Sequence, residues 1–299
     1  MVDSTTPALR KPLPSHGRVR LQQALLQAPT YLVVLVLGVA FGLPFLWAVL
    51  TSLKLPREIF LFPPTWLPED PQWFNYVEVF RQAPLALFFW NSLKVTVLTG
   101  IGQILSASLV AYGFARFRFP GRNILFLIML STLMLPPQIT IIPTFLLFKW
   151  LGWLDQLRSL YIPPWFGGGA FAIFLFRQFF LTIPREFDEA AKIDGANSLW
   201  IYFRILCPLS VPVFVTMGIF SFLGSWNDFF GPLIFLNTTA KFTLALGLTY
   251  FQRVVSIGGR ATEHLMMAAA IIMTLPCLLV FVLLQRYWIQ GIVMSGIKG

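Results

Sequence analysis

The sequence predicts an all-α integral membrane protein that crosses the bilayer six times. Of its 299 residues, 57% are hydrophobic and only 11% are charged, whereas ordinary soluble domains carry about 25% charged residues. A transmembrane helix needs roughly 20 mainly apolar residues to cross a hydrocarbon core about 30 Å thick. Six stretches of the chain are long and apolar enough: 28–53, 89–114, 123–148, 160–181, 211–236 and 264–288.

The formal net charge of +10 is spread over the ends of these stretches. A nucleic-acid-binding protein would gather its Lys and Arg residues on one face or stripe. We therefore expect no nucleic-acid partner, and we assign the charges to topology and to contact with the headgroups of the lipid bilayer. Residues 1–27 are polar and rich in proline, and they lack the short apolar core of a cleaved signal peptide. We expect them to remain as a tail before the first span.

Lys and Arg residues also predict the orientation, because cytoplasmic segments of membrane proteins carry an excess of both. Counted over alternate segments, 13 of them fall on the side of the two termini and eight on the other side. We therefore expect both termini in the cytoplasm, as tails at 1–27 and 289–299. Residues 28–88 would form the first span and an external segment, and residues 89–288 the transmembrane core.

Two of the six stretches contain residues that break helices. The third contains Pro136-Pro137 and Pro143, and the fourth contains Pro163-Pro164 followed by the run Gly167-Gly168-Gly169. In a bilayer a broken helix is tolerated where its freed backbone groups face protein or a water-filled cavity. A simple kink is the alternative, since Pro and Gly are frequent in membrane helices.

Residues 183–212 differ in character from the apolar stretches around them, and the predicted topology places them in the cytoplasm. Glu186, Asp188 and Glu189 load the start of a predicted helix with carboxylates, where the helix dipole favours negative charge. Ala190 and Ala191 add a small, flat surface that another protein could approach closely. This pattern favours a docking element.

A turn and a second helix complete this cytoplasmic element. Gly195 can supply the positive φ that a helix end needs. Ser198 can cap a second, amphipathic helix, in which Leu199, Phe203 and Leu206 recur at helical spacing. We therefore expect a helix–turn–helix element whose second helix rests on these three apolar residues.

The spacing Glu-Ala-Ala, three residues, Gly, nine residues, Ile, two residues, Pro occurs at 189–208. It resembles the EAA signature of permease subunits of binding-protein-dependent ABC importers, and EAAKIDGA at 189–196 is similar to their carbohydrate-uptake branch, which includes maltose and glycerol-3-phosphate permeases. Four further segments look like that branch at corresponding places: AYGFARFRFPGR (111–122), MLPPQITIIPTF (134–145), SWNDFFGPLIFL (225–236) and QRYWIQGIVMSGIKG (285–299). The resemblance covers about residues 89–299. Cys207 departs from the signature, which usually has Leu there, and we expect looser packing rather than lost function.

The resemblance implies the ABC type I importer permease fold and a set of partners. These are a sister permease in a heterodimer, two ATP-binding cassette subunits and an extracytoplasmic solute-binding protein. The cytoplasmic element would dock as coupling helices in a cleft of the ATPase subunit. ATP-driven closure would then switch the transmembrane cavity from inward-facing to outward-facing, a rigid-body transition of a bistable assembly.

The resemblance also implies roles for individual residues of the element. Glu189 would make a charged contact, Ala190 and Ala191 would pack closely, Gly195 would form the turn, and Asp194 would cap or brace it. The full predicted coupling set is Glu189, Ala190, Ala191, Asp194, Gly195, Ile205 and Pro208. Judged from the residues alone, an acidic loop solvated in the cytoplasm is the alternative.

The sequence carries no G-x-x-x-x-G-K-[ST] phosphate loop. We therefore expect a transport subunit without an ATPase site of its own, not an enzyme, and no cofactor. His16 and His264 fall on opposite sides of the predicted membrane, so that they predict no metal site. Cys207 and Cys277 fit small packing residues better than a disulfide.

Trp226, Asn227 and Asp228 form an unusual polar cluster inside the fifth stretch. A charge at membrane depth costs about 2.5–3.5 kcal/mol, so Asp228 should face the bundle interior or a cavity. In one interpretation the cluster belongs to a translocation pathway, where Asn227 and Asp228 bind sugar hydroxyls while Trp226, Phe229 or Phe230 stacks on a sugar. In the other it is a polar brace between helices near a helix break.

The predicted function is therefore that of a permease subunit of an ATP-driven importer of sugars, oligosaccharides or polyols. The alternative is a secondary transporter or channel that works without ATP. That class needs ionisable residues at several membrane depths or a detectable inverted repeat. The sequence has only Asp228 well inside a span and no halves that match.

Overall fold

The computed structural model describes residues 16–59, 61–251 and 262–296, and these form helices joined by turns, with no β-strand among them. Four helical segments within these ranges are each long and apolar enough to cross a bilayer: Pro29–Ser52, Leu85–Arg116, Arg158–Thr182 and Glu263–Gln285. Two bent helix pairs also qualify, which gives up to six spans if each pair is one span.

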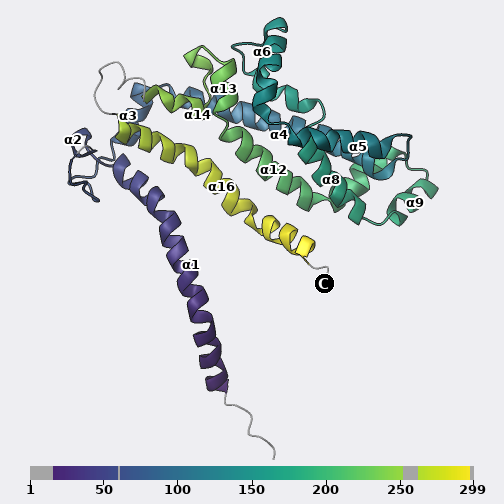
Figure 1. The fold of residues 1–299 in the computed structure, drawn as a ribbon, viewed down its shortest axis with the longest axis horizontal. Helices are drawn as coiled ribbons and strands as arrows, with labels where there is room; N and C mark the ends of the chain where they lie inside the picture. The colour runs from purple at the N-terminus through teal and green to yellow at the C-terminus, as the bar shows by residue number, and fades with distance from the viewer. Residues whose placement is uncertain (1–15, 60, 252–261, 297–299) are drawn as a thin grey trace, which may run out of the picture.

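The first and last spans meet near one end of the molecule. Helix α1 (His16–Ser52) runs away from the other helices over most of its length, and its C-terminal end packs against α16 (Glu263–Gly296) (Figure 1). The side chains of α1 from Tyr31 to Phe41 are exposed. An apolar helix with this much exposed surface is expected to face lipid or another subunit.

The segment between the first two spans is tied to the end of α1. It contains α2 (Pro56–Ile59) and α3 (Asn75–Gln82). The buried amide of Asn75 donates hydrogen bonds to the carbonyls of Ser52 (2.9 Å) and Lys54 (3.1 Å). Val79 of α3 is buried in a hydrophobic cluster that also contains Phe88 of α4 and Leu265 of α16. The segment is therefore ordered against the bundle.

Helix α4 (Leu85–Arg116) is the central helix, and it packs on the fourth and fifth spans along its length. Small residues allow this close packing: Ala107, Ala111 and Ala115 lie on its buried face against Phe176 and Phe180 of α8 (Ala170–Thr182). At Gly102 an added Cβ would lie 2.3 Å from the indole of Trp165. Glycine is therefore required there.

The third predicted stretch, 123–148, is not one straight helix. It consists of α5 (Arg122–Ser131), two 3₁₀ turns (Thr132–Met134 and Pro137–Thr140) and α6 (Ile141–Trp150), and the two halves are bent by 93°. The bend has a local cause. Pro136 is extended and precedes a second proline, and a residue before proline is driven out of the helical region.

The fourth span is broken where its sequence predicts a break, and α4 covers the break. It consists of α7 (Arg158–Tyr161), a 3₁₀ turn (Pro163–Trp165), three glycines with positive φ, and α8. Gln103 Nε2 donates to the carbonyl of Gly168 (3.0 Å) and Ser106 Oγ donates to that of Pro164 (2.9 Å). The freed carbonyls thus face side chains of a neighbouring helix, as the bilayer requires.

The fifth predicted stretch, 211–236, is also not one continuous helix. Helix α12 (Val211–Trp226) ends at the polar cluster, and a separate short helix α13 (Phe230–Phe235) follows. Beyond it lie a 3₁₀ turn (Thr239–Lys241) and α14 (Leu244–Gly247). The side chains cause the break: Asn227 Nδ2 bonds back to the carbonyl of Leu223 (2.9 Å), and Asp228 accepts from the N–H of Gly231 (3.1 Å), which ends one helix and starts the next.

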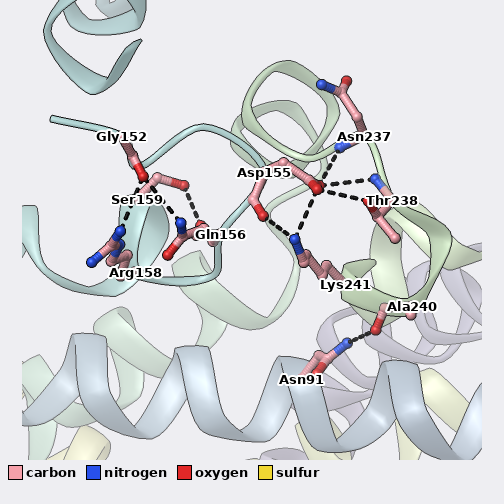
Figure 2. Close-up of polar contacts among 10 residues, drawn as sticks. All are labelled: Asn91, Gly152, Asp155, Gln156, Arg158, Ser159, Asn237, Thr238, Ala240 and Lys241. Atoms are coloured by element: carbon pink, nitrogen blue, oxygen red, sulfur yellow. Dashed lines mark hydrogen bonds and ion pairs between the residues drawn. The ribbon is translucent and has the colours of Figure 1, made fainter. Parts of the chain in front are cut away.

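A polar latch joins the segment after α13 to the loop between α6 and α7 (Figure 2). The carboxylate of Asp155 accepts hydrogen bonds from the N–H groups of Asn237 and Thr238 (both 2.9 Å), from the Thr238 hydroxyl (2.6 Å) and from Lys241 Nζ (2.8 Å). Asn91 of α4 donates to the carbonyls of Ala240 and Phe242. The latch thus holds three segments together: the loop between α6 and α7, the turn after α13, and the first part of α4.

The latch makes a pH-dependent contribution to stability. Burial alone would raise the pKa of Asp155, but the hydrogen bonds from Lys241, Thr238 and Asn237 outweigh it and hold that pKa well below its ordinary value. A carboxylate whose pKa is lowered by folding stabilises the folded state above its unfolded pKa, about 3.9, and this stabilisation is lost as the pH falls below that value.

We therefore predict that Asp155→Asn lowers the free energy of unfolding by about 1 kcal/mol at pH 7. Asn tolerates the positive φ of 55° at this position, so that the change removes charge and not backbone geometry. Thermal unfolding of the detergent-purified chain would measure it from pH 7 to pH 3. The difference between wild type and variant should shrink towards pH 3. A difference that stays constant over this range would contradict the latch.

Candidate functional site

The cytoplasmic element of the sequence analysis is a helix, a turn and a second helical segment. Helix α9 (Glu186–Ile193) is followed by Gly195, whose φ is +83°, and by α10 (Ser198–Ile201), a π-helical turn (Tyr202–Leu206) and α11 (Cys207–Leu209). The N–H of Gly195 bonds to the carbonyl of Lys192 and that of Ala196 to the carbonyl of Ala191. The left-handed glycine therefore closes α9, as predicted.

The second helix starts differently from the prediction. Its N-cap is Asn197, whose side chain accepts a hydrogen bond from the N–H of Trp200 (2.8 Å), so Ser198 is the first helical residue and not the cap. The predicted apolar face is also partly wrong: Leu206 is buried, but Leu199 and Phe203 are exposed. Ile201 and Tyr202 are buried instead, because the π-helical turn widens the helix and rotates its faces.

A hollow of about 750 Å³ lies on the surface of this element, and five of the seven predicted coupling residues line it. Glu189 and Pro208 are exposed and lie outside the lining. Ala190 is exposed, whereas Ala191 is buried at the floor. The complete lining is Glu186, Phe187, Ala190, Ala191, Asp194, Gly195, Ala196, Asn197, Trp200 and Ile205.

Large apolar side chains are exposed on this element, and two of them, Phe187 and Trp200, line the hollow. Ile193 is 87% exposed, and about half or more of each of the side chains of Phe187, Leu199, Trp200 and Phe203 is also accessible. Figure 1 shows α9 at the end of the molecule opposite to α2 and α3. A concave surface bordered by exposed apolar groups is typical of a protein–protein interface.

A buried ion pair ties this element to the central helix. Arg116 Nε at the end of α4 lies 3.0 Å from Asp188 Oδ2 of α9, and the two side chains are only 4% and 10% exposed. The same guanidinium donates to the carbonyl of Ile183 (3.0 Å), and Arg185 donates to that of Ala115 (3.4 Å). This pair was not predicted from the sequence. There, Arg116 counts only among the basic residues that set the membrane orientation, and Asp188 only as a carboxylate favoured at the start of a helix.

Two tyrosines add a second connection to α4. The hydroxyl of Tyr112 donates to the carbonyl of Ser198 (3.0 Å), and the hydroxyls of Tyr202 and Ser108 lie 2.7 Å apart. Both tyrosine rings are buried and pack on each other with centroids 5.4 Å apart. Helix α4 therefore holds both halves of the element, and a movement of the element would move α4.

The side chains of the cluster Trp226-Asn227-Asp228 and of Phe229 have different surroundings. Trp226 is 1% exposed, stacks on Phe222 and donates from Nε1 to the carbonyl of Met273 (3.0 Å). Asn227 and Phe229 are exposed, and Asp228 is half-buried at the edge of a second hollow. This placement favours a bracing role for Trp226 and leaves only Asp228 beside a cavity.

Within the described ranges no three His, Cys, Asp or Glu side chains come together as they would to hold a metal ion. His264 is buried in α16, and the side chain of His16 lies outside the described ones. Both cysteines are free thiols.

Comparisons with known proteins agree on one family. Residues 103–293 match the family described as the binding-protein-dependent transport system inner membrane component. The chain is 32% identical over 265 residues to the probable ABC transporter permease protein YurM of Bacillus subtilis, covering 87% of this chain and 85% of that protein. It is 34% identical over 226 residues to the arabinooligosaccharides transport system permease protein AraQ of the same organism, covering 75% and 78%.

A solved structure shares the fold. It is the crystal structure of a bacterial ABC transporter involved in the import of the acidic polysaccharide alginate, matched with a TM-score of 0.77 and 22% identity. The match covers 93% of this chain and 99% of that one. The helical membrane fold of an ABC importer permease, predicted from the sequence, is thus confirmed, and the number of spans remains four to six.

The buried pair gives a prediction about the element itself. Asp188→Ala leaves Arg116 buried and uncompensated, which should cost about 3–5 kcal/mol of stability. Exchange of the two charges (Arg116→Asp with Asp188→Arg) should recover part of that loss. Glu189→Ala, a change at an exposed neighbour, is the matched control and should cost less than about 0.5 kcal/mol. Thermal unfolding in detergent measures the stability of all three variants. Equal losses of stability for Asp188→Ala and Glu189→Ala would refute a stabilising role of the Arg116–Asp188 pair.

Proposed function

This chain belongs to the family of binding-protein-dependent transport system inner membrane components, and from this membership we propose that it is the membrane-spanning permease subunit of an ATP-driven carbohydrate importer. The observation that carries the proposal is the hollow on the cytoplasmic element, which gathers five residues of the EAA-type motif on one surface. Its exposed apolar rim suits docking of a partner protein. The partner that supplies ATP hydrolysis would be an ATP-binding cassette subunit, two copies of which complete such an importer.

The mechanism follows from the connections of α4. Closure of the two ATPase subunits would displace the docked element, and the Arg116–Asp188 pair would carry this displacement into α4. Helix α4 packs on both α8 and α12, so the transmembrane helices would move with it as a unit. Such a rigid-body rearrangement would switch the membrane cavity between its inward-facing and outward-facing states.

Individual residues take different parts in this docking. Glu189 is exposed beside the hollow and would make the charged contact with the ATPase. Ala190 offers the close-packing surface, Asp194 braces the turn, and Ile205 adds an apolar wall. Pro208 lies outside the hollow and would set the direction in which the chain enters α12.

Carbohydrate cargo is supported by the relatives and not by a bound solute. AraQ is named for the transport of arabinooligosaccharides, and the structural neighbour belongs to an importer of a polysaccharide. A sister permease would form a heterodimer with this chain, and an extracytoplasmic solute-binding protein would deliver the cargo. A secondary transporter that works without ATP is the alternative, and it would show accumulation that does not depend on ATP.

The proposed orientation places both termini and the coupling element in the cytoplasm of a prokaryotic cell. The exposed positions Trp73 and Lys192 offer a test, since one lies in the external segment and the other on α9. With both native cysteines replaced, an impermeant thiol reagent should label Trp73→Cys in intact cells. It should label Lys192→Cys only in inside-out vesicles. The opposite pattern would refute the orientation and the coupling assignment together.

The coupling role predicts two separable defects. Glu189→Lys reverses a contact charge, and Gly195→Val forces a β-branched residue to adopt φ +83°, at a cost of about 1–3 kcal/mol. In proteoliposomes with the complete complex, either change should reduce uptake about tenfold or more, with ATPase activity no longer stimulated by the loaded binding protein. Glu69→Lys on the external segment and Gly113→Ala in α4, where an added Cβ meets no atom within 4 Å, are controls. Wild-type uptake and stimulation in the Glu189→Lys, Gly195→Val double variant would sink the proposal.

A further inference from the structure

A second hollow, of about 340 Å³, opens between α4 and α12 next to the fourth span. Its volume lies within the roughly 300–1,000 Å³ of small-molecule sites. Val95, Thr99 and Gln103 follow one another at a spacing of four residues, which places them on one face of α4. The complete lining is Val95, Thr99, Gln103, Leu160, Phe171, Met217, Phe220, Ser221, Gly224, Ser225 and Asp228.

The hollow contains polar side chains although it lies among apolar helices. Ser221 is 6% exposed, and its Oγ has no hydrogen-bond partner among the residues that the structure describes. The hydroxyl of Thr99, on the opposite wall, is buried and equally without a partner there. A buried hydroxyl with no partner costs about 1–3 kcal/mol. An occupant that donates and accepts hydrogen bonds would remove that cost for both walls.

The charge of the hollow is negative. Asp228 is the one charged side chain among its lining residues, which include no Lys, Arg or His. Its Oδ1 accepts from the N–H of Gly231 (3.1 Å), and a Cβ on Gly231 would come within 2.6 Å of Oδ2, so that only glycine leaves the carboxylate this position. A fixed carboxylate without a basic partner in the same hollow repels anions and accepts hydrogen bonds from hydroxyl groups.

Two aromatic residues line the hollow. Phe171 of α8 and Phe220 of α12 have ring centroids 6.0 Å apart and are both partly exposed. Aromatic faces bury apolar surface, which the C–H faces of a sugar ring can supply. The lining thus combines hydroxyl groups, one amide, one carboxylate and apolar rings, and this set suits a ligand that is uncharged, rich in hydroxyls and apolar on its ring faces.

We propose that this hollow is a binding site for an uncharged, polyhydroxylated solute on its path across the membrane. The inference rests on the proposed carbohydrate import and narrows it: neutral sugars and polyols fit this wall of the pathway, whereas phosphorylated sugars and uronates do not. The sequence suggests that Trp226 and Asp228 contact the solute together, but Trp226 is packed in the core. The residues that line the hollow with Asp228 and would contact the solute are Thr99, Gln103, Ser221 and Ser225.

The test uses water-soluble thiol reagents, so that the cargo need not be known. Single changes Ser221→Cys and Ser225→Cys are made in the complete complex, in a background where Cys207 and Cys277 are replaced. Each is treated with cationic trimethylammonium-ethyl methanethiosulfonate and with anionic sulfonato-ethyl methanethiosulfonate, with and without ATP. Thr96→Cys is the matched control, because Thr96 is buried on α4 with an equally unpartnered hydroxyl among the described residues but does not line the hollow.

Both cysteines in the hollow should react in at least one nucleotide state, and Thr96→Cys should not. After correction for the intrinsic reactivity of each reagent, the cationic one should react about tenfold faster or more, because Asp228 attracts it. Asp228→Asn should abolish that preference. Cysteines that stay unreactive in every state would show that lipid or a sister subunit fills the hollow, and an equal or faster reaction with the anionic reagent would overturn the selectivity for neutral solutes.

A second arm measures transport with two probes, labelled arabinotriose and an alginate trisaccharide. Import of the neutral probe should fall about tenfold in a Thr99→Val, Ser221→Ala variant, because two hydrogen bonds to the solute are lost. Thr96→Val should leave it unchanged. Import of the alginate probe alone would contradict the proposal, and if neither probe is imported the thiol reagents decide. A failure of the proposed function appears separately, as wild-type uptake that does not require ATP.

Discussion

The requirement that every backbone polar group inside a bilayer finds a partner in the protein governs this structure. The fourth span is broken by two prolines and three glycines, which free carbonyl groups at membrane depth. Helix α4 meets them with two polar side chains, Gln103 and Ser106, and it can approach so closely because Gly168 has no Cβ. The unbroken central helix is therefore the partner that makes the broken span possible, and the rest of the bundle is arranged around it.

The same helix connects the element at 183–212 to the transmembrane bundle. A buried ion pair is costly to form, because both charges lose water, and it is strongly specific in position once formed. Arg116 and Asp188 thereby define where α9 sits on the end of α4, and Tyr112 and Tyr202 do the same for the second half of the element. The surface that faces away from α4 is left exposed and apolar, which is the property that a docking surface needs and a solvated loop lacks.

The polar groups between α4, α8, α12 and α16 are of two kinds. Those that hold helices together are satisfied, such as Ser106 on Pro164 and the indole of Trp226 on Met273. Thr99 and Ser221 are not satisfied by any described residue, and they face a hollow that also holds a carboxylate. Burying a polar residue at membrane depth costs free energy. Where such a residue has no hydrogen-bond partner in the protein, a transported solute could supply one. Some polar side chains of the bundle therefore hold helices together, and others line the proposed binding site.

The sequence by itself determined the class of the protein, the approximate position of the apolar stretches, the breaks in two of them and the motif at 189–208, because each is a local pattern of composition or spacing. The turn at Gly195 also followed from one residue type. Only the tertiary structure decided that the third stretch bends by 93°, that α12 stops at Trp226, that Asn197 is the cap and that Arg116 pairs with Asp188. The Arg116–Asp188 pair joins two helices far apart in the chain, and local periodicity carries no information about such a contact. The bend, the end of α12 and the cap have local causes, but these are hydrogen bonds from side chains to the backbone and proline geometry, which a hydrophobic period does not describe.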